Sequence, residues 1–290
     1  MPELVDFLLE PFRSGIGQRA LAEVVLVAAI GGALGFWVLT FGLAYGAESL
    51  AHGLLPGLVI AALVGAPLLL GAAGGVLAAA ALIALAARDT RVGPEIAVGV
   101  TVTTAFGLGA MLALTPDVPA RLGELLFGEL LGTTTADLVA ACGLSAVVGL
   151  ALWAGHRPLA AAVFDPLAAP SLGVRPGRVE LALLVLLALA VVAAVQGLGN
   201  LLVLALIVAP AAGALRLGRT IGMQIALAAA LGALSGLLGL VASAELDLAA
   251  GASVALAAIV LWMLAALLGP RPPSPAGGTP RSLAETLSGG

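Results

Sequence analysis

Charged side chains are scarce in this sequence. Asp, Glu, Lys and Arg make up 10% of the 290 positions, whereas hydrophobic residues make up 61%. Because an average soluble domain carries about 25% charged residues, this composition excludes a water-soluble fold. Several apolar stretches run for about 18 residues or more, which is the length at which a helix crosses the hydrocarbon core of a bilayer. The composition therefore predicts one polytopic membrane domain.

Lysine is absent, and all 12 basic residues are arginines. A P-loop nucleotide site needs the lysine of its Gly-Lys-Ser/Thr motif to reach the phosphates, so this chain is not a conventional ATPase. The net charge of −4 makes nucleic acid a poor partner. The single cysteine, Cys142, has no second cysteine to pair with and is expected to pack between helices.

Nine apolar segments follow one another along the chain, and we expect them to be membrane-spanning helices, with eight as the alternative count. They lie near residues 20–41, 44–64, 67–87, 94–114, 135–155, 179–196, 199–215, 221–243 and 248–268. Glycine and alanine abound in them, as in membrane bundles whose helices approach closely. The alternating ten-residue pattern of membrane β-barrels is absent from the sequence. We therefore expect an all-α transmembrane bundle.

The remaining segments are expected to lie outside the bilayer. Residues 1–19 mix charged and apolar side chains like an amphipathic helix at the membrane interface. The following apolar stretch is too long for a signal-peptide core, so no cleavage is expected. The loop at 115–134 is too charged to span and is expected along the outer surface. The proline-rich tail, residues 269–290, is expected to be disordered and cytoplasmic, and residues 20–268 form the transmembrane domain.

The arginines predict the orientation of the bundle, because short cytoplasmic loops retain them. Under alternation of nine spans, one side collects Arg88, Arg91, Arg157, Arg175, Arg178, Arg216, Arg219, Arg271 and Arg281. We expect this side to be cytoplasmic. The opposite side keeps Arg121 and the acidic residues Asp117, Glu245 and Asp247, while Arg13 and Arg19 are exceptions.

Two ionisable residues lie close together inside the second span. Glu48 and His52 are four residues apart, so a helix places them on one face, roughly 6 Å apart. Placing an ionisable side chain at the bilayer centre costs about 2.5–3.5 kcal/mol on insertion scales, which makes such residues functional candidates. A carboxylate and an imidazole on one face can hold a divalent cation. The alternative is a Glu–His hydrogen bond that satisfies both groups without a ligand.

Two ligands underfill a transition-metal site, which usually takes four or more. Two copies of the chain around a two-fold axis would bring two carboxylates and two imidazoles to one central pathway.

Other polar residues have structural explanations of equal weight. Glu95 follows Pro94 at the start of the fourth span and is expected to favour the helix N-terminus. Asp165 is expected to cap a short helix, with a partner contact as the alternative. Gln196 and Asn200 are expected in a turn. The connection Arg216, Leu217, Gly218, Arg219 and Thr220 is either a solvated loop or a docking helix on which a separate motor protein pushes.

Several ordered motifs resemble the membrane permeases of zinc, manganese and iron ABC importers. Residues 48–57, with Glu48, His52 and Pro56-Gly57, resemble that family's acidic-x-x-Ser-His and Pro-Gly run. Further similar segments are 126–132 (Leu-Phe-Gly-x-Leu-Leu-Gly), 164–168 (Phe-Asp-Pro), 197–214 (ending in Pro-Ala-Ala-Gly-Ala), 235–240 (Ser-Gly-x-x-Gly) and 250–252. The resemblance covers nearly all of residues 16–268.

The resemblance implies a permease homodimer in the prokaryotic cytoplasmic membrane, two cytoplasmic ATPase subunits and an extracytoplasmic metal-binding protein that delivers the ion. It implies a divalent metal ion as cargo, no permanently bound cofactor, Glu48 and His52 in the ion pathway, and residues 216–222 as the coupling element. The sequence departs from the family pattern where Glu48 replaces an aspartate and Ala51 a serine. A basic pair that precedes the motif in the family is also missing.

Two other functions remain open from the sequence. A secondary transporter could couple uptake to protons through Glu48 and His52, because acidic and histidine pairs also serve as proton relays. An ABC permease for a metal chelate is the second alternative, although such permeases generally have more spans.

Overall fold

The computed structural model describes residues 12, 14–86, 94–114, 134–198 and 203–269, and within these ranges the regular structure is helical throughout. The helices are, in chain order, α2 (Gly15–Thr40), α3 (Ala44–Val64), α4 (Leu68–Ala86), α5 (Pro94–Ala113), α7 (Thr135–Ala154), α8 (His156–Phe164), η3 (Ala169–Leu172), α9 (Pro176–Leu198), α10 (Val203–Leu217), α11 (Ile221–Leu246) and α12 (Ala250–Leu268). The prediction of an all-α bundle is confirmed.

Each of the nine predicted spans coincides with one described helix. Six of these helices are long and apolar enough to cross a membrane, and the apolar parts of α4, α5 and α10 are shorter. The first helix starts earlier than its apolar stretch, because Ser14 caps it by accepting a hydrogen bond from the backbone N–H of Gly17 at 3.0 Å. Most of the predicted interfacial segment 1–19 (residues 1–11 and 13), of the predicted outer loop 115–134 (residues 115–133) and of the predicted disordered tail 269–290 (residues 270–290) lies outside the described residues.

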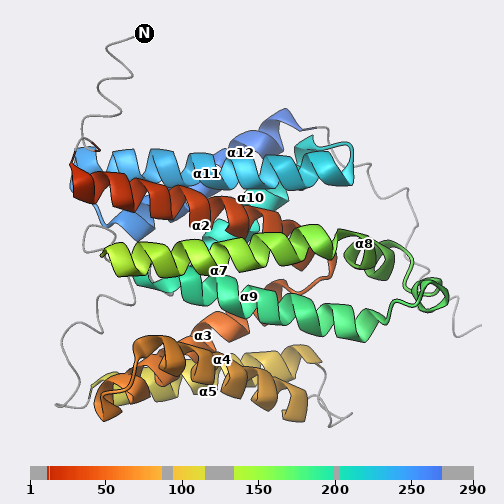
Figure 1. The fold of residues 1–290 in the computed structure, drawn as a ribbon, viewed down its shortest axis with the longest axis horizontal. Coiled ribbons are helices and arrows are strands. Elements are labelled where there is room, and N and C mark those ends of the chain that lie inside the picture. The colour runs from red at the N-terminus through yellow and green to blue at the C-terminus, as the bar shows by residue number, and fades with distance from the viewer. Residues whose placement is uncertain (1–11, 13, 87–93, 115–133, 199–202, 270–290) are drawn as a thin grey trace, which may run out of the picture.

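The helices form two groups that lie side by side (Figure 1). The larger group, called here the α2 bundle, is α2, α7, α9, α10, α11 and α12, with α2 packed against α7, α9, α10 and α11. The smaller group, called here the α3 unit, is α3 packed between α4 and α5. Helix α9 contacts α3 and α4 as well as α2 and therefore connects the two groups.

Large apolar side chains fill the α2 bundle. Trp37, Phe36 and Leu34 of α2 are fully buried, and the ring of Trp37 meets Phe36 edge to face at 5.0 Å between centroids. Buried leucines of α9 and α10 complete this core. Buried residues of α2, α3, α4, α7, α8, α9, α10, α11 and α12 therefore belong to one continuous packed interior.

Small residues allow the closest helix contacts in both groups. In the α2 bundle, an added Cβ at Gly32 would collide with the backbone of Ala228, and one at Gly232 would collide with the backbone of Ala28. In the α3 unit, Gly57 of α3 meets the backbone of α4 at Gly71 and Gly75 in the same way. Both crossings follow the small-xxx-small pattern of membrane helix pairs.

The described arginines that we predicted to be cytoplasmic gather at one end of the molecule, called here the basic end. They are Arg157, Arg175, Arg178, Arg216 and Arg219, which belong to the start of α8, the start of α9, the end of α10 and the turn before α11. Figure 1 shows these helix termini on the same side, with α8 and η3 projecting beyond the ends of the long helices. Glu245 and Asp247 lie at the opposite end, where α11 ends.

Candidate functional site

The candidate site is a polar stripe on α3 formed by Tyr45, Glu48 and His52, called here the α3 stripe. One helix covers all three residues, so the predicted common face of Glu48 and His52 exists. Tyr45 is 68% exposed, whereas Glu48 and His52 are half-buried. A polar stripe that remains partly open in an apolar bundle needs water, an ion or another polar surface against it.

The imidazole of His52 contacts an aromatic ring and accepts no hydrogen bond at Nδ1 from the described residues. Its ring meets Phe106 of α5 edge to face, at 5.4 Å between centroids. The Nδ1 atom is buried and has no hydrogen-bond partner among the described residues, and the same holds for the hydroxyl of Ser49, which is fully buried. The structure therefore does not form the Glu48–His52 hydrogen bond that was the alternative to a metal site.

Pro56 adds an oxygen atom to the surroundings of His52. Proline lacks an N–H, so Pro56 inside α3 cannot donate the helical hydrogen bond to the carbonyl of His52 four residues before it. Helix α5 also comes close here, because a Cβ on Gly109 would lie 3.0 Å from the backbone nitrogen of Pro56. The surroundings of the stripe thus include a carboxylate, an imidazole and a backbone carbonyl that cannot accept a hydrogen bond from residue 56.

One chain does not complete a transition-metal site from these side chains. No group of three or more His, Cys, Asp or Glu side chains that could hold a metal ion exists among the described residues. Transition metals usually take four or more ligands. A metal ion at Glu48 and His52 would therefore need further ligands from water, from backbone oxygens or from a second molecule.

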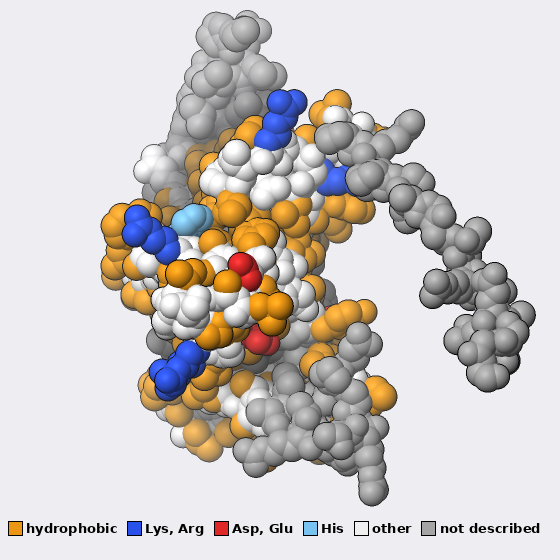
Figure 2. Space-filling model, turned by 90° about the vertical axis from the view of Figure 1, so that its right-hand side faces the viewer, with side chains coloured by type: hydrophobic (Ala, Val, Ile, Leu, Met, Phe, Trp, Pro, Cys, Tyr) orange, Lys and Arg blue, Asp and Glu red, His pale blue; other side chains and the backbone are white. Residues whose placement is uncertain are grey.

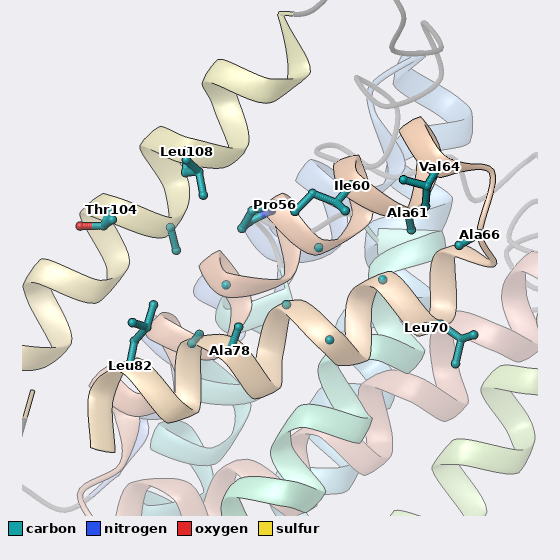
Figure 3. Close-up of a pocket in the computed structure, with 17 residues that line it drawn as sticks. Pro56, Ile60, Ala61, Val64, Ala66, Leu70, Ala78, Leu82, Thr104 and Leu108 are labelled. Atoms are coloured by element: carbon teal, nitrogen blue, oxygen red, sulfur yellow. The ribbon is translucent and has the colours of Figure 1, made fainter. Parts of the chain in front are cut away.

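An apolar cavity of about 420 Å³ lies directly beside the stripe, between α3, α4 and α5 (Figure 3). Gly53 and Pro56 of α3, Gly71 and Gly75 of α4, and Leu108 of α5 are among its lining residues. Thr104 is the only side chain with a polar atom in this lining. The cavity cannot replace the hydration shell of an ion, but it leaves space between α3, α4 and α5 unfilled.

Asp165 does not cap the short helix η3, whose N-cap is Ala168; its Oδ1 instead accepts a hydrogen bond from the backbone N–H of Ala168 at 3.0 Å and closes the turn that follows α8. Its carboxylate is exposed at the end of α8. Glu95 is the second residue of α5, as expected, but its side chain lies outside the described part. The same is true of the side chain of Gln196 and of all of Asn200.

The segment Arg216 to Thr220 forms a tight turn and not a separate docking helix. Arg216 and Leu217 end α10, and Thr220 caps α11 by accepting from the backbone N–H of Met223 at 3.3 Å. The side chain of Arg216 donates to the carbonyl of Ala266 on α12, at 3.5 Å. Three residues, 218–220, separate α10 from α11, and hydrogen bonds hold the chain at both ends of this connection. This length is too short for a separate helix.

The structure shows two features that the sequence analysis missed. Glu23 of α2 is 3% exposed, and it satisfies the same criterion that drew attention to Glu48, an ionisable residue inside an apolar span. The second is the α8–η3 protrusion, residues 156–172, where Phe164, Leu167 and Leu172 are 58%, 93% and 71% exposed. Large apolar side chains between arginines, outside the spans, are the signal that could have found it.

Comparison with known proteins supports the assignment of this architecture to a family. The model of the ABC 3 transport family matches residues 15–269. The manganese transport system membrane protein MntC of Halalkalibacterium halodurans is 34% identical over 256 residues, which are 88% of this chain and 87% of that protein. The manganese import system permease protein ScaB of Streptococcus parasanguinis is 29% identical over 254 residues, covering 88% of this chain and 91% of that protein.

A solved structure shares the fold over nearly its whole length. A chain in PsaBC from Streptococcus pneumoniae in complex with Fab superposes with a TM-score of 0.85 at 26% identity, covering 92% of this chain and 96% of that chain. The family match spans every described helix from α2 to α12, and it includes the α3 stripe and the α8–η3 protrusion. The chain therefore belongs to the ABC 3 transport family.

Proposed function

We propose that this chain is the permease subunit of an ABC importer for divalent transition-metal ions, with manganese as the first cargo to test. It is a multi-pass protein of the cytoplasmic membrane. The names of MntC and ScaB support manganese, and a carboxylate and an imidazole suit manganese, iron and zinc alike. The observation that carries the proposal is the buried Nδ1 of His52, which has no hydrogen-bond partner within the described residues.

In this proposal, two copies of the chain face each other through their α3 stripes. The two-fold arrangement supplies two Glu48 carboxylates and two His52 imidazoles, which together reach the usual ligand number. A half-exposed polar stripe on each copy then becomes the wall of an ion pathway. The longer side chain of Glu48, where the family usually has aspartate, reaches further toward the two-fold axis.

The basic end supports a second part of the proposal, the docking of cytoplasmic ATPase subunits. Figure 2 looks onto this end and shows arginine side chains, in blue, spread across it with little acidic surface. The exposed apolar side chains of the α8–η3 protrusion lie at the water-facing end, where a folded partner would bury them. The neighbouring turn with Arg216, Leu217, Gly218, Arg219 and Thr220 transmits the movement to α10 and α11. A separate metal-binding protein delivers the ion at the opposite end.

The experiment is ATP-driven manganese uptake by proteoliposomes that contain this chain together with its ATPase, with the metal-binding delivery protein supplied on the other side of the membrane. We expect Glu48→Ala and His52→Ala each to lower uptake by more than about tenfold, since even residues that only support metal ligands cost 10- to 100-fold. Assembly with the ATPase should survive in both variants. Glu245→Gln, which removes an exposed carboxylate at the far end of α11, is the matched control and should transport normally. Unchanged uptake in both stripe variants contradicts the site.

The same preparation separates the alternatives. Uptake by the purified chain without ATPase, driven by a proton gradient, would favour a secondary transporter that uses Glu48 and His52 as a relay. Uptake of a metal only when it is bound to an organic chelator would favour a chelate permease.

A further inference from the structure

A groove runs down the outer face of α9 from the basic end toward the middle of the bundle, and it is called here the α9 groove. It encloses about 640 Å³ between α7, α8 and α9. Its lining consists of Ala151, Gly155, Pro158, Leu159, Gly173, Val174, Arg175, Arg178, Val179, Leu181, Ala182, Leu183, Val185 and Leu186. Only the two arginines in this set carry charge, and both belong to the mouth of the groove at the start of α9.

The groove has a charged mouth and a long apolar floor. From Arg175 to Leu186 the helix advances by about 16 Å at about 1.5 Å per residue, so the floor extends well into the depth that hydrocarbon occupies. Leu181 and Val185 are exposed along it. Arg175 and Arg178 are also exposed. Within the described residues neither arginine has an ion pair, so two positive charges face the mouth without a counter-charge.

The acidic groups near the mouth do not neutralise these arginines. Glu180 is exposed on α9 but does not line the groove, because its position on the helix is turned away from the lining face. Asp165 also lies outside the lining, and its Oδ1 accepts the hydrogen bond from Ala168. Arg157 of α8 is not a lining residue and adds a further positive charge to this end.

We propose that the α9 groove binds one anionic phospholipid of the cytoplasmic leaflet. Its phosphate lies between Arg175 and Arg178, and one acyl chain follows Leu181, Ala182 and Val185. Arginine pairs well with phosphate oxygens, and basic pockets between membrane helices on the cytoplasmic side suit anionic headgroups. The bound lipid fills the space behind α8 and thereby supports the α8–η3 protrusion from the membrane side.

A protein occupant fits this groove less well. A water-soluble ATPase reaches the mouth, but it cannot enter the hydrocarbon region in which the floor lies. A second copy of the chain could cover the floor, yet it would have to bring a negative charge to the arginines at the mouth. A phospholipid satisfies both ends at once.

The test is native mass spectrometry of the full chain purified in detergent and incubated with phosphatidylglycerol or with phosphatidylcholine. We expect one phosphatidylglycerol per chain to be retained in preference to phosphatidylcholine. Arg175→Gln and Arg178→Gln should each lower this retention about fivefold, since a basic residue near an anionic membrane surface contributes about that factor. Arg219→Gln removes one exposed charge from the same end outside the groove and should change retention less than twofold.

A second variant tests the floor without touching the charges. Ala182→Phe fills the groove and should lower phosphatidylglycerol retention although both arginines remain. Equal loss in Arg219→Gln, or unchanged retention in Ala182→Phe, would show general surface attraction and overturn the proposal. Disulfide formation between copies at Ala182→Cys, in a Cys142→Ser background, would instead show that a second chain covers the floor. Elution of each variant as the same species on gel filtration confirms that it is folded.

Discussion

In the α2 bundle, the close crossing of α2 and α11 at Gly32 and Gly232 is surrounded by large buried side chains such as Trp37. In the α3 unit, the equally close crossing of α3 and α4 at Gly57 and Gly75 borders a cavity of about 420 Å³. Close backbone contact is therefore common to both groups, and the filling around it differs. The polar stripe belongs to the α3 unit, where this cavity lies between α3, α4 and α5.

This difference indicates different roles for the two groups of helices. A filled core has few alternative arrangements of similar energy, so the packed interior around α2, α10 and α11 is suited to hold these three helices in fixed positions. The α3 unit has space beside Gly53 and Pro56, immediately after His52. If Glu48 and His52 bind the ion as proposed, α3 carries the ligands next to this unfilled space.

The largest expected effect comes from replacing one glycine of the α2 bundle with leucine, in comparison with the same replacement in the α3 unit. Gly32→Leu should unfold or strongly destabilise the chain, because its Cβ would collide with the backbone of Ala228, and overpacking typically costs about 1–3 kcal/mol and occasionally more. Gly74→Leu places the same side chain at a position with open space on the cavity wall. It should be neutral or stabilising by up to about 1 kcal/mol through helix propensity. Thermal unfolding in detergent measures both, and equal destabilisation would contradict the difference in filling.

A smaller effect is expected from a substitution in the α8–η3 protrusion, which packs against α7 and α9 of the α2 bundle. Leu167→Asp should weaken assembly with the ATPase by more than about 1 kcal/mol, or about fivefold in affinity, since it replaces an exposed apolar side chain in the proposed interface. Arg219→Ala in the neighbouring turn should have a smaller effect. Titration of the purified ATPase against each variant measures the affinity, and wild-type binding by Leu167→Asp would remove the protrusion from the interface.

The smallest effect on stability is expected from two cysteine substitutions that test by cross-linking which surface lies between two copies. In a Cys142→Ser background, whose own change should be within about 0.5 kcal/mol, Tyr45→Cys should form a disulfide between two copies under mild oxidation. Leu77→Cys on α4 has a similar exposure, 67% against 68% for Tyr45, and should not do so. Non-reducing gels distinguish the two outcomes. Cross-linking only at Leu77→Cys would place the interface on the other side of the α3 unit.

The sequence was sufficient to predict the bundle and the common face of Glu48 and His52, because both follow from apolar length and helical spacing. It did not predict the surroundings of His52, since Phe106 lies 54 residues further along and its contact depends on how α5 packs. It did not predict the α8–η3 protrusion, because α8 is short and contains Pro158. Glu23 was overlooked although Arg19 lies four residues before it on the same helix face.

The most direct test of the account is the number of metal ions bound by the purified permease. Equilibrium binding of manganese to the full chain in detergent should approach one ion for two chains, because each α3 stripe supplies half of the ligands. Binding should disappear in Glu48→Ala and in His52→Ala, and Glu48→Asp should retain it. One ion for each chain, or binding that survives in both alanine variants, would contradict a metal site shared between two α3 stripes.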